Sequence, residues 1–122
     1  MSTTAEKEQI SQKLQQQYNN YQENIAELEN QLSSLTSQVQ EHAIVDTTLS
    51  SIPPESRAGR KCFKMIGGVL INKSVDEVIK ILNDEIKELT TQRAKVDEAL
   101  KKNRKGLEEW MKNNHVKIIR NQ

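Results

Sequence analysis

Three kinds of residue in this chain of 122 could do chemistry: one cysteine, two histidines and a pair of adjacent glycines. A thiolate nucleophile at Cys62 would need a basic partner, such as a histidine, beside it. His42 and Asp46 are four residues apart, so they would share one helix face and could offer a metal an imidazole and a carboxylate. Gly67–Gly68 could cradle a phosphate group.

Each of these patterns lacks the residues that would complete it. Cys62 belongs to no Cys-x-x-Cys pair, two metal ligands rarely suffice, and neither Gly-x-Gly-x-x-Gly nor Gly-Lys-Ser/Thr accompanies the glycines. We interpret Cys62 as a small apolar strand residue, and His42 with Asp46 as a polar layer in a helix pair. The sequence therefore predicts no enzyme, with no catalytic residue, metal ligand or cofactor.

Two further patterns have plain structural interpretations. Asn72-Lys73-Ser74 is a formal glycosylation sequon, and without a secretory signal it reads as a strand end followed by a helix cap. The basic cluster over 101–105 is interpreted as a solvated helix face, with docking of a partner or of acidic clients as the open alternative.

The composition excludes a conventional enzyme fold. Apolar residues make up 34%, aromatic residues 3% and charged residues 29%, which is too little apolar surface for an enclosed core and pocket. The net charge of +1 gives no argument for nucleic acid or an anionic membrane, and no apolar run could span a bilayer. Because the first residues show no apolar signal region and one cysteine cannot staple the chain, we expect a reducing, cytoplasmic location.

Long helices must position these residues, because Gly and Pro are absent from residues 1–52 and nearly absent after Ser74. The first segment carries a heptad seam with alternating spacings of four and three. Nine of the eleven seam positions are apolar or aromatic, which predicts a coiled-coil helix over about 5–52. The seam consists of Leu14, Tyr18, Tyr21, Ile25, Leu28, Leu32, Leu35, Val39, His42, Asp46 and Leu49.

A second heptad segment predicts a helix over about 75–113. Its polar exceptions are Arg93 and Asn103, and polar seam residues fix register at some cost in stability. Ser74 as the N-cap and Glu77 three residues later form a predicted capping box. The seam consists of Val75, Ile79, Leu82, Ile86, Leu89, Arg93, Val96, Leu100, Asn103, Leu107 and Trp110.

The two helical segments carry opposite charge. Residues 1–52 hold two Lys and seven acidic residues, a net charge of −5, whereas residues 75–122 hold eleven basic and nine acidic residues, a net charge of +2. Opposite charge favours pairing of the two segments with each other. We predict a mainly α fold: a long antiparallel two-helix coiled coil with a single β-hairpin inserted at the connector.

The connector, over about 53–73, predicts a loop and a β-hairpin. Pro53–Pro54 ends the first helix. Gly67–Gly68 separates two β-prone runs, and a two-residue turn of type I′ or II′ needs the positive φ that glycine tolerates. The predicted register pairs Ile66 with Val69, Met65 with Leu70, Lys64 with Ile71 and Phe63 with Asn72.

This hairpin is unfinished by itself. An isolated two-stranded hairpin is marginal in water, and its edges expose unpaired backbone groups. The hairpin bears apolar side chains on both faces. We expect the apolar faces of the two helices to pack against each other, which would leave the hairpin uncovered. We therefore predict that the missing partner strands come from other subunits.

The block over 60–71, Arg-Lys-Cys-Phe-Lys-Met-Ile-Gly-Gly-Val-Leu-Ile, set between two coiled-coil helices, resembles β-type prefoldin subunits. It is most similar to the eukaryotic subunit 2 members of that family, which also share the upstream residues His42, Val45, Asp46 and Leu49. The specific match covers about 42–82. The resembling architecture covers nearly the whole chain, so we expect residues 1–122 to be a single prefoldin β-type domain with a short tail over 114–122.

The resemblance implies a hexameric co-chaperone of two α-type and four β-type subunits, in which this chain has three further β-type neighbours. It implies that the hairpins join into a β-barrel platform and that the coiled coils project from it. It further implies ATP-independent capture of unfolded actin and tubulin at coiled-coil tips and transfer to the cytosolic chaperonin, with no nucleic acid and no membrane. The expected oligomerisation hairpin consists of Phe63, Met65, Ile66, Gly67, Gly68, Val69, Leu70 and Ile71.

Holding an unfolded chain requires apolar contacts that are weak and multivalent. Seam residues at the free coil ends could supply them, and each buried side chain would contribute about 1.5–3 kcal/mol. The open alternative is that Leu107 and Trp110 complete the seam of the coiled coil and do not contact a client. The candidate client-contact residues are Ile10, Leu14, Tyr18, Leu107, Trp110, Met111, Val116, Ile118 and Ile119.

Two other functions compete with the co-chaperone. A structural coiled-coil adaptor or tether would also use long heptads, but it has no use for an apolar hairpin in mid-chain. A nucleic-acid-binding zipper would need a basic segment leading into its heptads, whereas the first helical segment here is acidic. The hairpin is therefore the feature that separates the co-chaperone from the tether.

Overall fold

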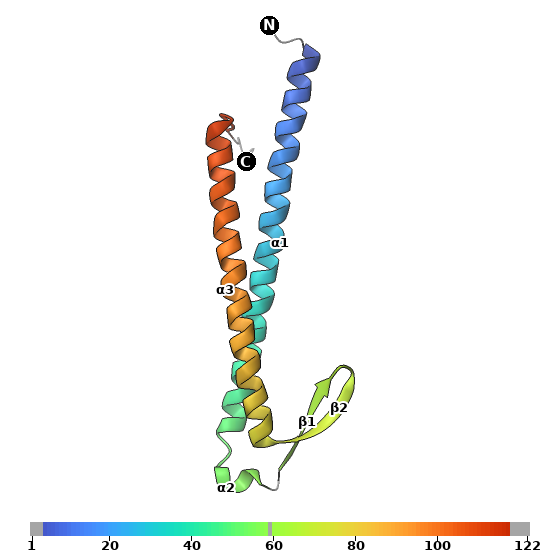
Figure 1. Ribbon diagram of the computed structural model, residues 1–122, viewed down its shortest axis with the longest axis vertical. Helices are drawn as coiled ribbons and strands as arrows, with labels where there is room; N and C mark the ends of the chain where they lie inside the picture. Colours follow the sequence, from blue (N-terminus) through green and yellow to red (C-terminus); the bar gives the residue numbers. More distant parts are fainter. Residues whose placement is uncertain (1–3, 59, 118–122) are drawn as a thin grey trace, which may run out of the picture. The chain divides into compact units, whose positions relative to one another are not determined.

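A computed structural model describes residues 4–58 and 60–117, which fall into two compact units. The aromatic unit contains the described residues of 1–32 and 95–122, and the hairpin unit contains those of 33–94. Each unit holds one part of helix α1 (Thr4–Ser50) and one part of helix α3 (Val75–Asn113) (Figure 1). The predicted fold class is confirmed, with two long helices and an antiparallel hairpin between them.

The two long helices begin and end close to their predicted bounds. Helix α1 contains no glycine or proline, and its polar surface is supported by side-chain hydrogen bonds between residues four apart. Gln15 Nε2 donates to Asn19 Oδ1 at 3.0 Å, and Gln38 Nε2 donates to Ser34 Oγ at 3.1 Å. Local propensity and local pairing thus agree over the whole length of α1.

Contacts within each unit show that the two helices run antiparallel. In the aromatic unit, Gln17 of α1 contacts Trp110 of α3, while Glu29 further along α1 contacts Arg104 earlier in α3. In the hairpin unit, His42 of α1 contacts Glu85 of α3. Arg57, after the end of α1, reaches Asp76 in the first turn of α3. The predicted antiparallel pairing therefore holds in both units.

The buried side chains lie mostly on the predicted seam. In the aromatic unit these are Ile25 and Leu100, and in the hairpin unit they include Val75 and Leu82. Val78 is also buried, although it is no seam position. Val78 comes three residues after Val75 and four before Leu82, so it widens the apolar stripe at the start of α3.

The connector contains a one-turn helix, α2 (Pro54–Arg57), that the sequence did not predict. Pro54 occupies its first position, where the missing N–H costs nothing. Arg57 then folds back over the end of α1, donating from Nε to the Ile52 carbonyl at 2.8 Å and from Nη2 to the Ser50 carbonyl at 3.0 Å. The guanidinium thereby caps carbonyl groups that the helix end leaves without a partner.

The hairpin consists of β1 (Lys61–Ile66) and β2 (Val69–Ser74), and the four predicted residue pairs are all confirmed. The ladder extends further, to Cys62 with Lys73 and Lys61 with Ser74. Gly67 and Gly68 have φ values of 55° and 83°, which identifies a type I′ turn. Its twist matches that of the flanking strands, and this match fixes the register.

Helix α3 begins directly after the hairpin. The backbone N–H of Glu77 donates to Ser74 Oγ at 3.2 Å, as the capping box predicts. The reciprocal half of the box is replaced, since the Glu77 carboxylate lies 3.7 Å from Lys73 Nζ. β2 and α3 therefore join without an intervening loop.

Helix α3 ends in a Schellman motif. The N–H of Val116 donates to the Met111 carbonyl at 2.9 Å, and the N–H of His115 donates to the Lys112 carbonyl at 3.3 Å. His115 takes the left-handed position, with φ 53°, that glycine usually occupies. The motif turns the chain away from the helix axis at Val116.

Candidate functional site

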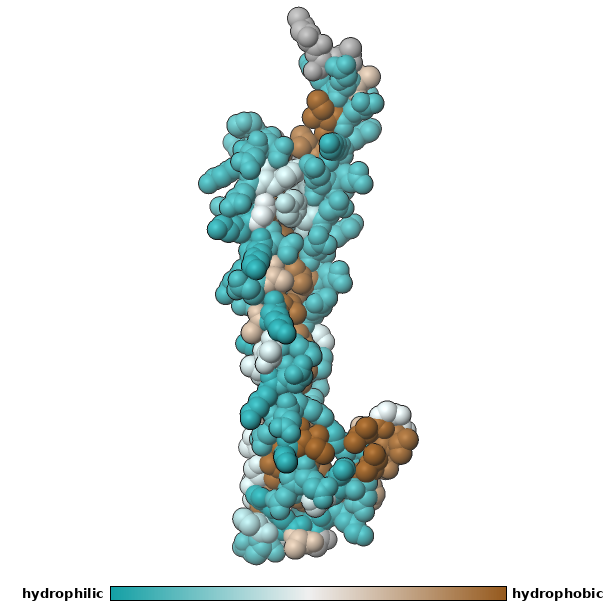
Figure 2. Space-filling view, viewed as in Figure 1, coloured by the Kyte–Doolittle hydropathy of each residue, from teal (hydrophilic) through white to brown (hydrophobic). Residues whose placement is uncertain are grey.

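The two faces of the hairpin differ in what they expose. Side chains alternate between faces along each strand, so Phe63, Met65 and Leu70 share the outer face. These three side chains are 58–63% exposed, and Figure 2 shows the apolar surface of the hairpin. Exposed apolar side chains in a contiguous patch mark an interaction surface.

The inner face of the hairpin is covered at its base. Lys64 and Ile71, a cross-strand pair, are half-buried, and Lys64 Nζ lies 3.0 Å from Glu85 Oε1 on α3. Val78 lies two turns before Glu85 on α3, so the two side chains share one helix face. The prediction that the chain leaves its hairpin uncovered is therefore wrong at Lys64 and Ile71, which are half-buried, and the Lys64 side chain reaches Glu85 on α3.

The tip of the inner face stays exposed. Ile66 and Val69 pair across the strands next to the turn, and both are exposed. All the residues of the expected oligomerisation hairpin therefore lie on one two-stranded element, and of these only Ile71 is half-buried.

Glu85 joins three elements of the hairpin unit. Its Oε2 lies 2.7 Å from His42 Nε2 of α1, and its Oε1 accepts from Lys64 of β1. Partial burial alone would raise the pKa of Glu85, but hydrogen bonds and positive charge from Lys64 and His42 outweigh it and lower that pKa. The charged carboxylate therefore links α1, α3 and the hairpin, and its contacts with His42 and Lys64 are called the clasp below.

The clasp shows which residues His42 and Asp46, predicted as a polar layer, contact. His42 uses both ring nitrogens, since Nδ1 lies 2.8 Å from the Gln38 carbonyl oxygen and Nε2 faces Glu85. Asp46 instead accepts from Ser50 Oγ, at 3.4 Å. Spacing along one helix could not reveal a partner that lies forty-three residues away on another.

Cys62 lies half-buried on the inner face of the hairpin, as predicted for a strand residue. Over residues 4–58 and 60–117 there is no group of three or more metal-binding side chains. In that same part of the chain, no helix combines the length and apolar character needed to cross a membrane.

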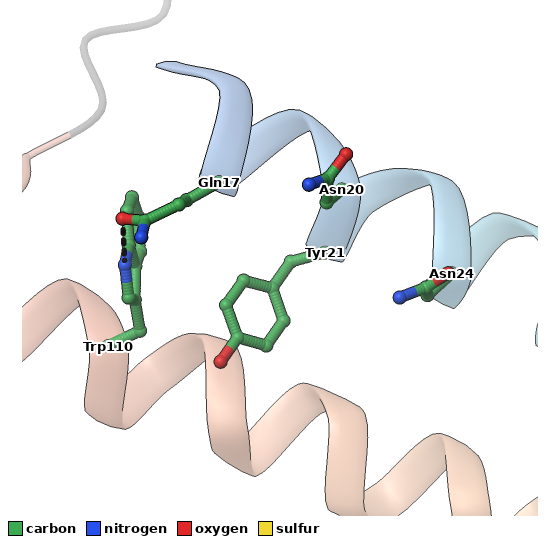
Figure 3. Close-up of a pocket in the computed structure, with 5 residues that line it drawn as sticks. All are labelled: Gln17, Asn20, Tyr21, Asn24 and Trp110. Atoms are coloured by element: carbon green, nitrogen blue, oxygen red, sulfur yellow. Dashed lines mark hydrogen bonds between the residues drawn. The ribbon is translucent and has the colours of Figure 1, made fainter. Parts of the chain in front are cut away.

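Trp110 organises the aromatic unit (Figure 3). Its Nε1 donates to Gln17 Oε1 at 3.1 Å, and its ring centroid lies 6.4 Å from that of Tyr18 and 6.0 Å from that of Tyr21. Gly106 lies close to this cluster, since a β-carbon there would come within 3.4 Å of Tyr21 Cε1, an ordinary contact distance. Aromatic pairs in this range contribute about 0.5–1.5 kcal/mol beyond their burial.

Two shallow grooves flank Trp110. One, of about 270 Å³, is lined by Gln17, Asn20, Tyr21, Asn24 and Trp110. The other, of about 310 Å³, has the apolar lining residues Leu14, Tyr18, Trp110 and Val116, with Ser11, Gln15 and Lys117 beside them. Because the chain turns at His115, the Val116 side chain lines this groove together with the seam residues Leu14, Tyr18 and Trp110.

The candidate client-contact residues divide by exposure. Ile10 is exposed, whereas Leu107 and Met111 are half-buried on α3. The second groove brings together Leu14, Tyr18, Trp110 and Val116. Ile118 and Ile119 lie outside the described residues.

The basic cluster over 101–105 makes exposed ion pairs. Lys101 Nζ lies 3.2 Å from Asp97 Oδ2 one turn away, and Arg104 lies 2.9 Å from Glu29 Oε1 of α1. The Arg104 pair links the two helices with the opposite charges that the sequence predicts. These contacts fit the interpretation of a solvated helix face.

Sequence reasoning missed an apolar pair on α1 in the hairpin unit. Ile44 is 67% and Val45 is 46% exposed, although both are large and apolar. They stand between the seam positions His42 and Asp46, with Ile44 on the side of α1 opposite the seam and Val45 beside the seam. Apolar residues outside a heptad seam are the signal that could have found them.

Comparisons with known proteins place these features in a family. The sequence model described as prefoldin subunit matches residues 12–120. Prefoldin subunit 2 of Saccharomyces cerevisiae is 32% identical over 114 residues, which cover 93% of this chain and 99% of the yeast protein. Probable prefoldin subunit 2 of Schizosaccharomyces pombe is 28% identical over 95% of this chain and 98% of its own. Human prefoldin subunit 2 is 26% identical over 75% of this chain and 57% of the human protein.

Proposed function

This chain belongs to the prefoldin subunit family, and from that premise we propose that it is one β-type subunit of a hexameric co-chaperone that captures unfolded proteins without ATP. Its neighbours are two α-type and three further β-type subunits. Its clients are unfolded chains such as actin and tubulin, which pass to the cytosolic chaperonin, and its location is the cytoplasm.

The observation that carries the proposal is the exposed outer face of the hairpin. Burying Phe63, Met65 and Leu70 would contribute about 1.5–3 kcal/mol for each side chain. The hairpin also has two strand edges, and its only ladder within the described residues is the one between β1 and β2. Strands of sister subunits that add to these edges would supply backbone hydrogen bonds and cover the apolar face.

The covered base of the inner face supports the same role. The Lys64–Glu85 contact ties β1 to α3, so within the hairpin unit the outer face points away from α3. A hairpin held in this way offers its apolar face in a defined direction. Preorganisation of this kind lowers the entropic cost of assembly.

The aromatic unit is the proposed site of client capture. Its second groove combines aliphatic and aromatic side chains with open access, and Met111 adds a flexible, polarizable contact nearby. Each such contact is weak, so useful affinity comes from several subunits acting on one client. No catalytic step and no cofactor enter this mechanism.

Assembly is tested by reconstitution with the sister subunits of the same organism. The double variant Met65→Lys/Leu70→Lys puts two charges on the outer face, and we expect it to be absent from the complex in native mass spectrometry. Asn72→Lys is the matched control, because Asn72 is an exposed polar residue of the same face. Normal assembly of the double variant would overturn the proposed role of the hairpin.

Client capture is tested separately with a chain truncated after Asn113. This truncation removes Val116 from the second groove but leaves the hairpin unchanged. The reconstituted complex should still form and should suppress aggregation of denatured actin less effectively than the full-length chain. Unchanged suppression would reject the assignment of client contacts to this end.

A further inference from the structure

The first groove beside Trp110 has no role in the function proposed above. It lies within the aromatic unit, and its lining differs from that of the second groove. Three of its five lining residues, Gln17, Asn20 and Asn24, carry a carboxamide group, and none of the five carries a charge. The second groove is largely apolar, so the two grooves suit different parts of a ligand.

The three carboxamides are called the amide row below. Figure 3 shows Gln17, Asn20 and Asn24 following one another along α1. Asn20 and Asn24 are exposed, and neither side chain makes a hydrogen bond within the residues that the structure describes. Gln17 uses its Oε1 to accept from Trp110 Nε1 and keeps its amide nitrogen as a donor. The amide row therefore holds several donors and acceptors that the described fold does not use.

The chemistry of the amide row selects its ligand. A carboxamide offers an acceptor oxygen and an N–H donor, which complement the N–H and C=O groups of a polypeptide main chain. An ion would find no opposite charge among the lining residues. An apolar group would displace water from the amides without replacing its hydrogen bonds, which costs free energy. The lining thus fits a neutral ligand with both donors and acceptors.

The spacing of the amide row matches an extended chain. Asn20 and Asn24 are one turn apart, which separates them by about 6 Å along the helix axis. In an extended chain, residues that face the same side repeat at about 6.6 Å. A chain that lies along α1 can therefore present one peptide group to each asparagine. A ligand that is itself a helix cannot do so, because its peptide groups are bonded to each other.

The amide row is continuous with the proposed client site, because Trp110 lines both grooves. An extended chain that crosses Trp110 can place an apolar side chain in the second groove and its main chain against the amide row. Two weak contacts on one ligand reinforce each other. The second groove alone would accept any exposed apolar group, whereas the amide row adds a requirement for unpaired main chain.

We propose that the amide row, Gln17, Asn20 and Asn24, binds the extended main chain of an unfolded client. The inference rests on the proposed client capture and deepens it by naming the groups recognised, the peptide N–H and C=O. Every polypeptide carries these groups, so the site needs no particular client sequence. A folded protein has already paired them, so it is not a ligand.

Photo-crosslinking in the reconstituted complex tests the inference. A benzophenone amino acid replaces Gln16, an exposed residue one turn before Asn20 on α1. The probes are a labelled peptide of four Gly-Leu-Ser repeats and its analogue in which ester oxygens replace the leucine N–H groups. The probe concentration that gives half-maximal adduct on this chain should be about three- to tenfold higher for the ester, because its lost N–H groups cannot donate to the amide row. Equal concentrations for the two probes would overturn main-chain recognition.

The variant Asn20→Ala/Asn24→Ala assigns the effect to the amide row. Alanine is the better helix former, so α1 should remain folded. The double variant should bind the peptide about three- to tenfold more weakly and should no longer distinguish it from the ester. Asn30→Ala is the matched control, since Asn30 is an exposed residue of α1 in the same unit and does not line the groove. A double variant that still distinguishes the probes would overturn the site.

The remaining outcomes separate this inference from the proposed function. Carboxamides and aromatic rings can also receive sugar hydroxyls, so loss of the peptide adduct in the presence of maltopentaose would assign the groove to a glycan and overturn the inference. A complex that suppresses aggregation of denatured actin but forms no adduct with the peptide would reject the amide row alone. A complex that neither suppresses aggregation nor forms the adduct would reject the proposed client capture together with it.

Discussion

At the scale of single residues, Glu85 is the side chain that joins α1, α3 and the hairpin in the hairpin unit. It is exposed enough to stay charged, yet it accepts from Lys64 on the hairpin and contacts His42 on α1. Its role is to orient the hairpin, because removing either contact would free one of the elements that meet there.

Acid should weaken this clasp. Because the folded-state pKa of Glu85 is lowered, the carboxylate stabilises the folded state above the pKa of an unfolded glutamate, about 4.3. That contribution is lost as the pH falls through the lower folded-state value. Thermal unfolding from about pH 6 to about pH 3 should therefore show a steeper loss of Tm for the unaltered chain than for Glu85→Gln. Parallel curves would contradict the clasp.

His115 stores a local strain. A non-glycine residue in the left-handed region costs about 1–2 kcal/mol, of which glycine would return part because it also makes the unfolded chain more flexible. His115→Gly should raise the free energy of unfolding by about 0.5–1 kcal/mol in urea titrations. His115→Ala retains the strain and should give no gain. A glycine variant no more stable than the alanine variant would refute the Schellman ending.

Residue-level predictions succeeded where the signal was local. The Ser74 cap and the positive φ of Gly67 and Gly68 followed from turn and cap chemistry, which depends on neighbouring residues. The His42–Glu85 contact and the exposed pair at 44–45 were not predicted. The first depends on how α1 pairs with α3, which the spacing along one helix does not fix, and the second was visible only as apolar residues outside the seam.

At the scale of elements, the end of α1 depends on a residue beyond it. Arg57 donates to two carbonyl oxygens at the end of α1 and also to Asp76 Oδ1, at 2.9 Å. Arg57→Ala should lower the free energy of unfolding by about 2 kcal/mol, because the part-buried contact with the Ile52 carbonyl and the exposed contact with the Ser50 carbonyl lose a charged donor. Asp76→Asn, which removes only an exposed ion pair, should cost about 0.5 kcal/mol. Equal losses in both variants would mean that the ion pair, rather than the cap, matters.

The packing of α1 on α3 around Trp110 can be tested through Gly106. A β-carbon at this position meets Tyr21 at ordinary contact distance, so Gly106→Ala should fit and should stabilise α3 by about 0.5–1 kcal/mol through helix propensity. Gly106→Leu is too large for the space below Tyr21 and should be destabilising. Thermal unfolding of both variants checks the pair, and a stabilising leucine would contradict the packing of Tyr21.

Both long helices and the strand register were predictable, because heptad periodicity and a two-glycine turn are strong patterns. Helix α2 was not predictable, because a helix of four residues is too short to show a periodic pattern in the sequence. The burial of Val78 was missed because this residue lies outside the alternating four-and-three spacing of the seam.

At the scale of the whole molecule, the chain exposes apolar surface that a partner subunit could bury. Apolar side chains are exposed on the outer face and tip of the hairpin and, on α1, at Ile10, Ile44 and Val45. A chain that worked alone would gain nothing from such surfaces and would risk aggregation through them. Membership of the prefoldin subunit family gives this surface a purpose, namely assembly with sister chains.

The most direct test is native mass spectrometry of the complexes that hold this chain in its own cells. We predict an assembly of six small coiled-coil subunits with a single copy of this chain, which stays intact on dilution to nanomolar concentration. A stable monomer at that dilution, or an assembly without other members of the family, would contradict the claim that sister polypeptides complete the hairpin.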